Sequence, residues 1–226
     1  MPAAVASPQE LAAMTTPKNG LLFHFTHIDN LASVVSAGLS CDAVMVQSPN
    51  AFVNVGNQVI KARRRRRPVP DPHGGVVADY VPFYFAARSP MLYAIHMKNV
   101  QTYQGTQDEV AYLVTSTEAV VEQGLPFVYT DRNASMAVAK FSSDLAEIDS
   151  LVDWDLMRRR MFRNTDSDSD RVERRMAEFL VRDHVPWDTF IGVAVKNESR
   201  AQQVSGILTS LGVDQVPIRT RPDWYF

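Results

Sequence analysis

The sequence of 226 residues predicts a single mixed α+β domain. Short runs rich in β-branched and aromatic residues, roughly five to seven of them, have the composition of strands. Amphipathic segments with capping residues at their starts indicate short helices between and beside these strands. The strands do not alternate regularly with helices, which disfavours a doubly wound parallel sheet. The chain has no internal repeat and no linker that would divide it.

The N-terminal region is expected to begin with a flexible leader over residues 1–19, which is rich in Ala, Ser, Pro and Thr. A single domain over residues 20–226 should follow. The apolar residues 21–25 predict a first, buried strand. A helix is expected over residues 29–37, because Leu, Val and Val recur on one face and Gly38 ends the pattern.

The next region is expected to be loop-rich over residues 41–60. Five consecutive arginines, Arg63–Arg67, precede three prolines and two glycines, and this predicts a charged, extended and exposed loop. Aromatic and β-branched content predicts a strand over residues 80–86. Ser89 and Pro90 then begin a helix, as cap and first-turn residue.

The C-terminal half continues the mixed pattern. A helix capped by Ser116 should end at Gly124, residues 138–141 suit either helix or strand, and residues 153–161 form a helix or lead into a loop. An amphipathic helix is expected over residues 198–211. The remaining strands are expected at residues 110–115, 127–130, 179–181, 190–195 and 216–218.

Composition excludes several classes of protein. One cysteine, Cys41, cannot form an intrachain disulfide, so a disulfide-stapled secreted scaffold is excluded and a reducing cytoplasm is expected. No apolar run approaches the length of a membrane span, and the N-terminus lacks the pattern of a signal peptide. No metal site is expected, because His24 and His27 are the only close histidine pair and one cysteine cannot complete it.

The positions of the charged residues are more informative about a binding partner than the net charge is. The net charge of −2 argues against non-specific coating of nucleic acid, yet 18 of the 23 cationic residues are Arg. They cluster in Arg63–Arg67 and between Arg158 and Arg182. Arginine's planar fork suits bidentate phosphate binding. A compositional bias of the genome, or simply solvated charged faces, would give a similar pattern.

Known catalytic motifs are mostly absent from the sequence. It has no G-x-G-x-x-G, no P-loop and no G-x-S-x-G elbow, so dinucleotide binding on a Rossmann domain, P-loop phosphate transfer and an α/β-hydrolase lack their signatures. Glu178 leads into an apolar strand and should be partly desolvated, which makes it a functional candidate. A helix-surface Glu paired with Arg174 or Arg175 is the alternative, and periodicity alone favours it.

Several sequence blocks, from about residue 21 to the C-terminus, occur together in a recognisable order. They are residues 24–31 (HFTHIDNL) with Gly38-Leu39, Ile60-Lys61 with the arginine run, residues 80–93 (YVPFYFAARSPMLY), Tyr129-Thr130-Asp131, Asn164-Thr165-Asp166, residues 174–181 (RRMAEFLV) and His184-Val185-Pro186. The aromatic-Arg-Ser-Pro-Met-Leu and Ala-Glu-Phe-Leu-Val blocks are the most specific. Together the blocks resemble the DarT-like DNA ADP-ribosyltransferases, which are the toxins of bacterial toxin–antitoxin pairs.

The resemblance implies an ADP-ribosyltransferase fold, a split mixed β-core with NAD in the cleft between two small sheets. Glu178 would be the catalytic carboxylate, and one arginine of the run, Arg65 first and Arg64 next, would act with it and contact NAD. The other residues that the resemblance places at NAD are His24, Phe25 and Thr26 near the nicotinamide and its ribose, Asn30 and Ser33 on the adenosine side, and Tyr84 and Met91.

The resemblance also implies an acceptor base in single-stranded DNA and a macrodomain antitoxin of the DarG type as partner, with no membrane involved. Trp154 and Tyr129 are candidate stacking platforms, although core roles suit them too. Asn133 departs from relatives that carry His after Tyr-Thr-Asp, which puts a proton-relay role there in doubt. The arginines expected to bind DNA are Arg88, Arg158, Arg159, Arg163, Arg174 and Arg175.

Two other functions fit parts of the sequence. A transferase of the same fold could act on RNA or protein, although Met176, two residues before Glu178, stands where a Glu or Gln would favour a protein acceptor. A non-catalytic nucleic-acid-binding module could use the two arginine clusters alone. DNA binding that is independent of NAD, with no chemistry lost on Glu178→Gln, would identify the non-catalytic binding module.

Overall fold

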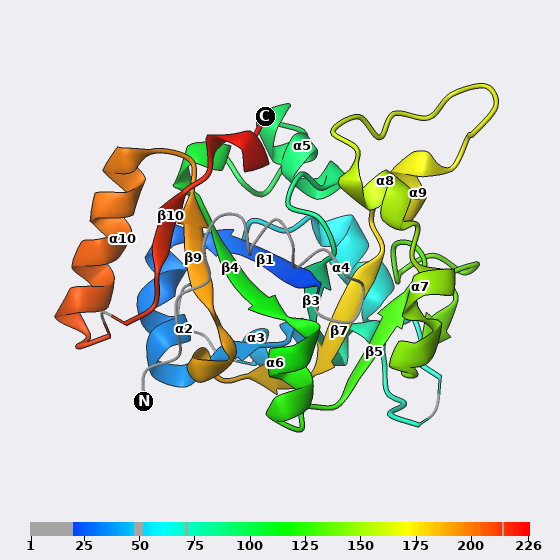
Figure 1. The fold of residues 1–226 in the computed structure, drawn as a ribbon, viewed down its shortest axis with the longest axis horizontal. Coiled ribbons are helices and arrows are strands. Elements are labelled where there is room, and N and C mark those ends of the chain that lie inside the picture. The colour runs from blue at the N-terminus through cyan, green and yellow to red at the C-terminus, as the bar shows by residue number, and fades with distance from the viewer. Residues whose placement is uncertain (1–19, 48–51, 71, 214) are drawn as a thin grey trace.

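A computed structural model describes residues 20–47, 52–70, 72–213 and 215–226, so the leader expected over residues 1–19 lies outside the described residues. The described residues form an eight-stranded sheet in the order β10-β9-β4-β1-β3-β7-β5-β6, and a two-stranded sheet of β2 and β8. Neighbouring strands of the large sheet are antiparallel except β9 and β10, which are parallel. Helices surround this central sheet (Figure 1).

The strands occupy the following residues: β1 Leu21–His27, β2 Leu39–Ser40, β3 Tyr80–Tyr84, β4 Val110–Ser116, β5 Phe127–Thr130, β6 Phe141–Ser142, β7 Glu178–Arg182, β8 His184–Val185, β9 Gly192–Val195 and β10 Ile218–Thr220. The α-helices are α2 Leu31–Ala37, α3 Asp42–Met45, α4 Gln58–Arg64, α5 Pro90–His96, α6 Thr117–Glu122, α7 Ile148–Leu151, α8 Trp154–Arg158, α9 Arg171–Arg174 and α10 Glu198–Ser210. Short 3-10 helices cover Ile28–Asn30, Val77–Asp79, Gln107–Glu109, Leu145–Glu147, Trp187–Thr189 and Pro222–Trp224.

The large sheet divides into two halves between β1 and β3. Strand β1 pairs with β4 over its whole length, from Leu21 to His27, but its register with β3 contains one pair, Phe23 with Tyr84. Strand β3 in turn pairs along its whole length with β7, where Tyr84 lies opposite Glu178. The strands on either side of this weak link therefore form two small four-stranded halves, as the expected split β-core requires.

The two faces of the sheet belong to different parts of the core. Leu22 packs in the larger cluster, together with residues of α2, α10 and β7. Phe23 and Phe25 point to the opposite face, as alternation along a strand requires, and pack in a second cluster with residues of α5 and β4. None of the helices in the described part of the chain is long and apolar enough to cross a membrane.

Most of the expected strands are present, with ends shifted by a few residues. The segment 138–141, expected as helix or strand, is mostly turn and irregular backbone, and only Phe141 belongs to the short strand β6. The extended loop expected at Arg63–Arg67 is wrong, because α4 continues through Arg64. Asn57 caps this helix: its Oδ1 accepts hydrogen bonds from the backbone N–H groups of Val59 and Ile60. The following Gln, Lys, Ala and Arg side chains are good helix formers.

Candidate active site

Glu178 is the first residue of β7 and lies at the divide between the two halves of the sheet. Its residue surface is 2% exposed, and its Oε2 accepts a hydrogen bond of 2.7 Å from Arg64 Nη1. The backbone of Ala134 also favours the charged form of the carboxylate. Burial raises the pKa of Glu178 above its ordinary value, while the Arg64 guanidinium opposes that rise. The helix-surface alternative for this residue is therefore wrong.

Thr130, at the end of β5, fixes the backbone of Glu178. Its Oγ1 accepts a hydrogen bond of 3.1 Å from the Glu178 N–H, and the hydroxyl itself donates to the carbonyl of Arg132 at 2.7 Å. In the sequence, Thr130 stood out only within the Tyr129-Thr130-Asp131 block of the family resemblance, since its partner lies 48 residues away. The start of β7 is thus held by side-chain contacts as well as by the strand ladder.

Arg64, and not Arg65, is the arginine of the run that meets Glu178. Arg64 is 7% exposed, and its Nη2 also lies 3.5 Å from the carbonyl oxygen of Val77. Arg65 is the C-cap of α4; its side chain is 41% exposed and forms an ion pair with Asp42 at 3.0 Å. This geometry favours Arg64 over Arg65 as the partner of Glu178, because consecutive helical residues point about 100° apart. The expected contact of Arg65 with NAD stays a prediction.

His24 lies on β1, half-buried, beside the same pair. Its Nδ1 donates to the Pro82 carbonyl at 2.8 Å, and its ring packs edge-on against Phe83. Burial lowers the pKa of His24 to about 4, and the charges of Arg64 and Lys61 lower it further, against the effect of the Pro82 carbonyl. The imidazole is therefore neutral at pH 7 with its proton on Nδ1, which leaves Nε2 as an acceptor.

We expect this neutral His24 to make folding stability depend on acid. Between the unfolded pKa of about 6.5 and the folded pKa of about 4, the unfolded chain binds more protons, so the free energy of unfolding falls as pH decreases through that window. His24→Asn keeps a donor for Pro82 and removes the titration. Urea unfolding at pH 7 and pH 4 should show a loss smaller by about 2–3 kcal/mol in the variant; equal losses in both proteins would contradict a buried neutral His24.

Tyr84 and Phe25 form the aromatic wall next to Glu178. Tyr84 lies directly opposite Glu178 across β3 and β7, and its ring stacks on Phe25 with centroids 6.1 Å apart. Burial raises the pKa of the Tyr84 hydroxyl, and the neighbouring Glu178 charge raises it further. Tyr84 is accordingly a protonated phenol at neutral pH, able to donate a hydrogen bond.

The other residues expected at NAD have varied positions. Thr26 and Asn30 are buried and bonded to each other, and the Asn30 amide also exchanges two hydrogen bonds with the backbone of Val53. This amide therefore ties β1 to the segment that leads into α4. Ser33 is on the exposed face of α2, and Met91 is buried in the second core cluster beneath α5, so neither has a contact that places it beside Glu178.

A cavity of about 510 Å³ lies at the end of β3 and beside α8. Four of the arginines expected to bind DNA line it: Arg88, Arg158, Arg159 and the buried Arg175. Trp154 lines it as well, as a partly buried residue packed against the main core. Tyr129, the other proposed stacking platform, is fully buried against Phe179 and cannot stack on a ligand.

Arg174 is occupied by acidic partners rather than free for DNA. Its guanidinium forms ion pairs with Asp153, Asp168 and Asp170, of which the Nε–Asp170 Oδ1 contact measures 2.8 Å. Asp153 precedes α8, and Asp168 and Asp170 lie at the end of the long loop between α8 and α9, so Arg174 anchors that loop. A DNA contact at Arg174 would have to compete with these ion pairs, and it stays a prediction. Arg163 lies exposed on the loop, outside the lining of the cavity.

The structure also brings residues to the site that the sequence did not single out. The C-terminal residues Arg221, Asp223 and Trp224 line the same cavity as Arg88, more than 130 positions away in the chain. No local pattern marks such a contact. Among the described residues, no three His, Cys, Asp or Glu side chains come together in a group that could hold a metal ion.

Comparison with known proteins gives a consistent result. The family model described as "ssDNA thymidine ADP-ribosyltransferase, DarT" matches residues 23–226. A DNA ADP-ribosyl transferase of Thermus sp. (strain 2.9) is 38% identical over 213 residues, which cover 94% of this chain and 99% of the relative. One from Escherichia coli O127:H6 is 31% identical, over 96% of this chain and 98% of its own length.

Solved structures agree. Thermus sp. 2.9 DarT in complex with ADP-ribosylated ssDNA superimposes with a TM-score of 0.84 at 37% identity, covering 92% of this chain and 96% of that one. The same protein in complex with NAD⁺ gives 0.82 at 36% identity, over 94% of this chain and 100% of that one. Together with the split sheet and the buried Glu178–Arg64 pair, these matches show that the chain belongs to the DarT family of single-stranded DNA thymidine ADP-ribosyltransferases.

Proposed function

We propose that this chain transfers ADP-ribose from NAD to a thymidine base in single-stranded DNA, with Glu178 as the catalytic carboxylate and Arg64 as its partner. The observation that carries the assignment of residues is the buried Glu178–Arg64 pair at the divide of the sheet. Burying an ion pair of this kind costs desolvation free energy, so a role in function explains it better than a role in stability.

The chemistry needs a fixed negative charge. The bond between ribose and nicotinamide breaks, a bond from the same carbon to the base forms, and the base loses a proton. Positive charge develops on the ribose in between, as in glycoside hydrolysis. A preorganised carboxylate in a site with little water stabilises that charge most effectively. Nicotinamide leaves as a neutral molecule, so its departure needs no acid.

Arg64 serves this carboxylate in two ways. Its hydrogen bond to Oε2 fixes one orientation of the Glu178 side chain. Its charge opposes the rise in pKa that burial causes and so favours the ionised form of the carboxylate. We assign it as the positioning residue of the pair. Arginine itself stays charged at any working pH and is poorly suited to carry the proton of the acceptor base.

The residues beside the pair fit the donor substrate. NAD supplies the ADP-ribose group and the nicotinamide leaving group. The acceptor nitrogen Nε2 of His24 suits a ribose hydroxyl, and the stacked rings of Phe25 and Tyr84 suit a flat pyridine amide. A Gly-rich phosphate loop is not needed, because these contacts come from side chains of β1 and β3.

We also assign this chain a place in a toxin–antitoxin pair. Its family resemblance suggests a macrodomain antitoxin of the DarG type that removes the modification, and a fold match at 20% identity is described as Thermosipho africanus DarTG in complex with ADP-ribose. A cytoplasmic location is consistent with the buried, unpaired thiol of Cys41.

The proposed reaction can be tested directly. Purified protein, NAD and thymidine-containing single-stranded oligonucleotides should yield DNA that is heavier by one ADP-ribose by mass spectrometry, with free nicotinamide in equal amount. Oligonucleotides without thymidine are the control and should stay unmodified. Modification of RNA or of protein in place of DNA would overturn the assignment of substrate.

A further inference from the structure

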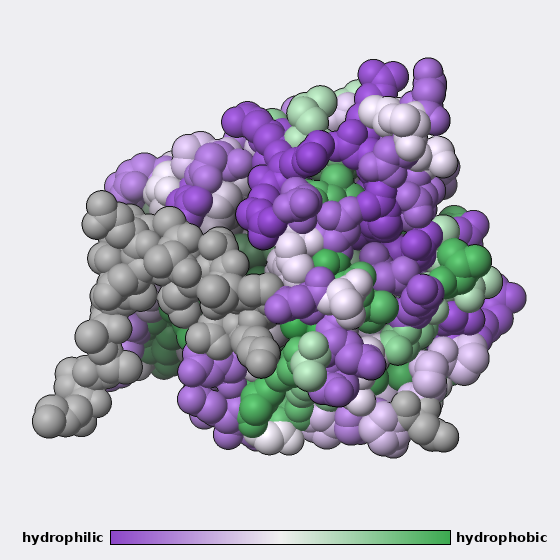
Figure 2. Space-filling model, turned by 45° about the vertical axis from the view of Figure 1, so that its right-hand side comes forward, coloured by the Kyte–Doolittle hydropathy of each residue, from purple (hydrophilic) through white to green (hydrophobic). Residues whose placement is uncertain are grey.

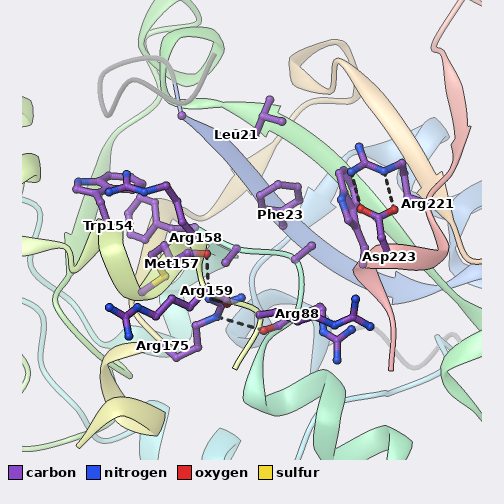
Figure 3. Close-up of a pocket in the computed structure, with 16 residues that line it drawn as sticks. Leu21, Phe23, Arg88, Trp154, Met157, Arg158, Arg159, Arg175, Arg221 and Asp223 are labelled. Atoms are coloured by element: carbon purple, nitrogen blue, oxygen red, sulfur yellow. Dashed lines mark hydrogen bonds and ion pairs between the residues drawn. The ribbon is translucent and has the colours of Figure 1, made fainter. Parts of the chain in front are cut away.

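The cationic side chains of the protein are held in different ways. Seen from the side of α8 and α9, the surface is largely hydrophilic in its upper part (Figure 2). Arg88 and Arg175 line the cavity beside α8 (Figure 3), and both donate to backbone carbonyls. Three residues of α4 and its C-cap are paired with carboxylates instead, and two of these three share one carboxylate, that of Asp42.

Asp42 binds Lys61 and Arg65 at the same time. Its Oδ1 accepts a hydrogen bond of 2.6 Å from Lys61 Nζ, and its Oδ2 accepts one of 3.0 Å from Arg65 Nη2. Lys61 and Arg65 are four residues apart, so they lie on one face of the helix. The side chains of Asp42 and Lys61 are 13% and 17% exposed, and water and salt screen such a pair less than a fully exposed one.

Asp42 is itself fixed to the chain that continues from the strand of Glu178. It begins α3, one residue after β2, and β2 pairs with β8. The backbone N–H of Cys41 donates to the carbonyl of Asp183 at 2.8 Å. Asp183 is the single residue between β7 and β8. The position of Asp42 is therefore tied to the end of β7 that lies away from Glu178.

Helix α4 depends on tertiary contacts for its position. It has 7 residues, and isolated helices of that length are unstable in water. Ile60 packs against the second core cluster, and Arg64 donates to Glu178. These two residues share one face, so on their own they restrain rotation about the helix axis weakly. Asp42 opposes that rotation from the neighbouring face, because Arg65 points about 100° away from Arg64.

The two sets of contacts join α4 to both ends of β7. Arg64 contacts Glu178, the first residue of the strand, directly. Asp42 connects the helix, through β2 and β8, to the segment that follows the last residue of the strand. A rotation of α4 that draws Arg64 away from Glu178 must therefore also break the contacts of Asp42.

We propose that Asp42 is a positioning residue of the transferase, which keeps α4 in the rotation that directs Arg64 to Glu178. It acts through Arg64 and touches neither substrate. The proposal rests on the proposed function and extends the buried pair by the residue that fixes its arginine. Small displacements of a reacting constellation are costly: about 1 Å can lower a rate a hundredfold.

The test begins with Asp42→Asn, which keeps the shape of the side chain and removes the charge that both cations bind. We expect kcat for ADP-ribose transfer to fall about tenfold. The KM values for NAD and for a thymidine-containing oligonucleotide should stay within about twofold, because the lost contact acts on the transition state. Asp42→Glu keeps the charge and should recover most of the native kcat.

The matched control is Asp108→Asn. Asp108 binds Lys196 at 2.7 Å, in an ion pair that joins the 3-10 helix Gln107–Glu109 to the end of β9 and includes no residue of α4. This variant loses a carboxylate charge of the same kind and should transfer at the native kcat. A loss equal to that of Asp42→Asn would show that any broken ion pair lowers the rate, and would overturn the proposal.

A second pair of variants keeps Asp42 in place, in case Asp42→Asn does not fold. Lys61→Gln/Arg65→Gln removes both partners of Asp42 and should lower kcat about as much as Asp42→Asn does. Either single substitution leaves Asp42 one partner and should cost less than the double one, since the two contacts are redundant. Two single losses that simply multiply to the double loss would contradict a shared action through Asp42.

A double-mutant cycle with Arg64 separates positioning from a general structural role. Once Arg64 is replaced by Gln, Asp42→Asn should lower kcat little further, because the residue that Asp42 positions is gone. Independent, multiplying losses would overturn the positioning role. The comparison uses protein that is folded by circular dichroism at the assay temperature.

The remaining outcomes separate this proposal from the proposed function. If the native protein transfers ADP-ribose to no oligonucleotide, the proposed function itself fails. If the native protein is active and Asp42→Asn has the native kcat, only the positioning role of Asp42 fails. A raised KM for NAD at unchanged kcat would also overturn that role, and would place the contact between Asp42 and Arg65 in the binding of the dinucleotide.

Discussion

Glu178→Gln should lower the rate of ADP-ribose transfer by about 10²–10³-fold or more, by analogy with the removal of a preorganised charge-stabilising group. The substitution keeps the shape of the side chain and leaves an amide oxygen to accept from Arg64, which donates at 2.7 Å in the native protein. What it removes is the charge opposite the developing cation. The measurement is single-turnover transfer to an oligonucleotide, read by mass.

The control for this substitution is Glu118→Gln, at an exposed position in the first turn of α6. It should transfer at the native rate. Binding of NAD to Glu178→Gln should persist, because the amide still offers hydrogen bonds to a ribose. A Glu178→Gln variant that is folded, binds NAD and transfers at the native rate would contradict a catalytic carboxylate at this position. Equal yields of the native protein and of Glu178→Gln in bacteria would argue against toxicity.

Expected desolvation made Glu178 a functional candidate, although periodicity favoured a helix-surface residue and only the family resemblance made it the catalytic carboxylate. A carboxylate at the start of an apolar strand has few ways to remain in water, and the next three residues, Phe179, Leu180 and Val181, are fully buried. The strands were predictable for the same reason, since their apolar content is local. The partner of Glu178 was not local: Arg64 lies 114 positions away, among four other arginines.

The ambiguity within the arginine run comes from the reading of secondary structure. If Arg63–Arg67 is taken as an extended loop, nothing indicates which arginine meets Glu178. If the segment is taken as part of a helix, Arg64 is indicated, because Ile60 and Arg64 are four residues apart and share a face. Ile60 packs against the second core cluster, so Arg64 must also point inward. The cap that starts this helix, Asn57, was the signal that could have shown it.

The second arginine cluster shows a different limit. Arg174 and Arg175 are neighbours in sequence, and both looked free to bind DNA. In the fold they hold the two ends of the loop between α8 and α9: Arg174 binds Asp168 and Asp170, and Arg175 binds the backbone around Met157. Arginine's several donors allow both roles, and only tertiary contacts decide between them.

Two matched substitutions, Arg64→Gln and Arg65→Gln, test which arginine of Arg63–Arg67 is the partner of Glu178. Arg64→Gln leaves the Glu178 charge buried without a partner, so we expect a loss of about 3–5 kcal/mol in the free energy of unfolding. Arg65→Gln breaks an exposed pair whose acid, Asp42, keeps Lys61 at 2.6 Å, and should cost about 0–1 kcal/mol. Urea unfolding of the three proteins measures both.

The rate of ADP-ribose transfer should also fall more in Arg64→Gln than in Arg65→Gln, but for a separate reason. Arg64→Gln frees the orientation of the carboxylate and lets its pKa rise unopposed, so we expect at least a hundredfold loss, about 2.7 kcal/mol of transition-state stabilisation. Arg65→Gln should stay within a few-fold of the native rate. The double variant Arg64→Gln/Glu178→Gln separates stability from activity: with no buried charge left it should recover much of the lost stability, yet remain inactive. If Arg65→Gln were instead the inactive, well-folded protein, the catalytic arginine would be Arg65 after all, and the Glu178–Arg64 contact would be structural.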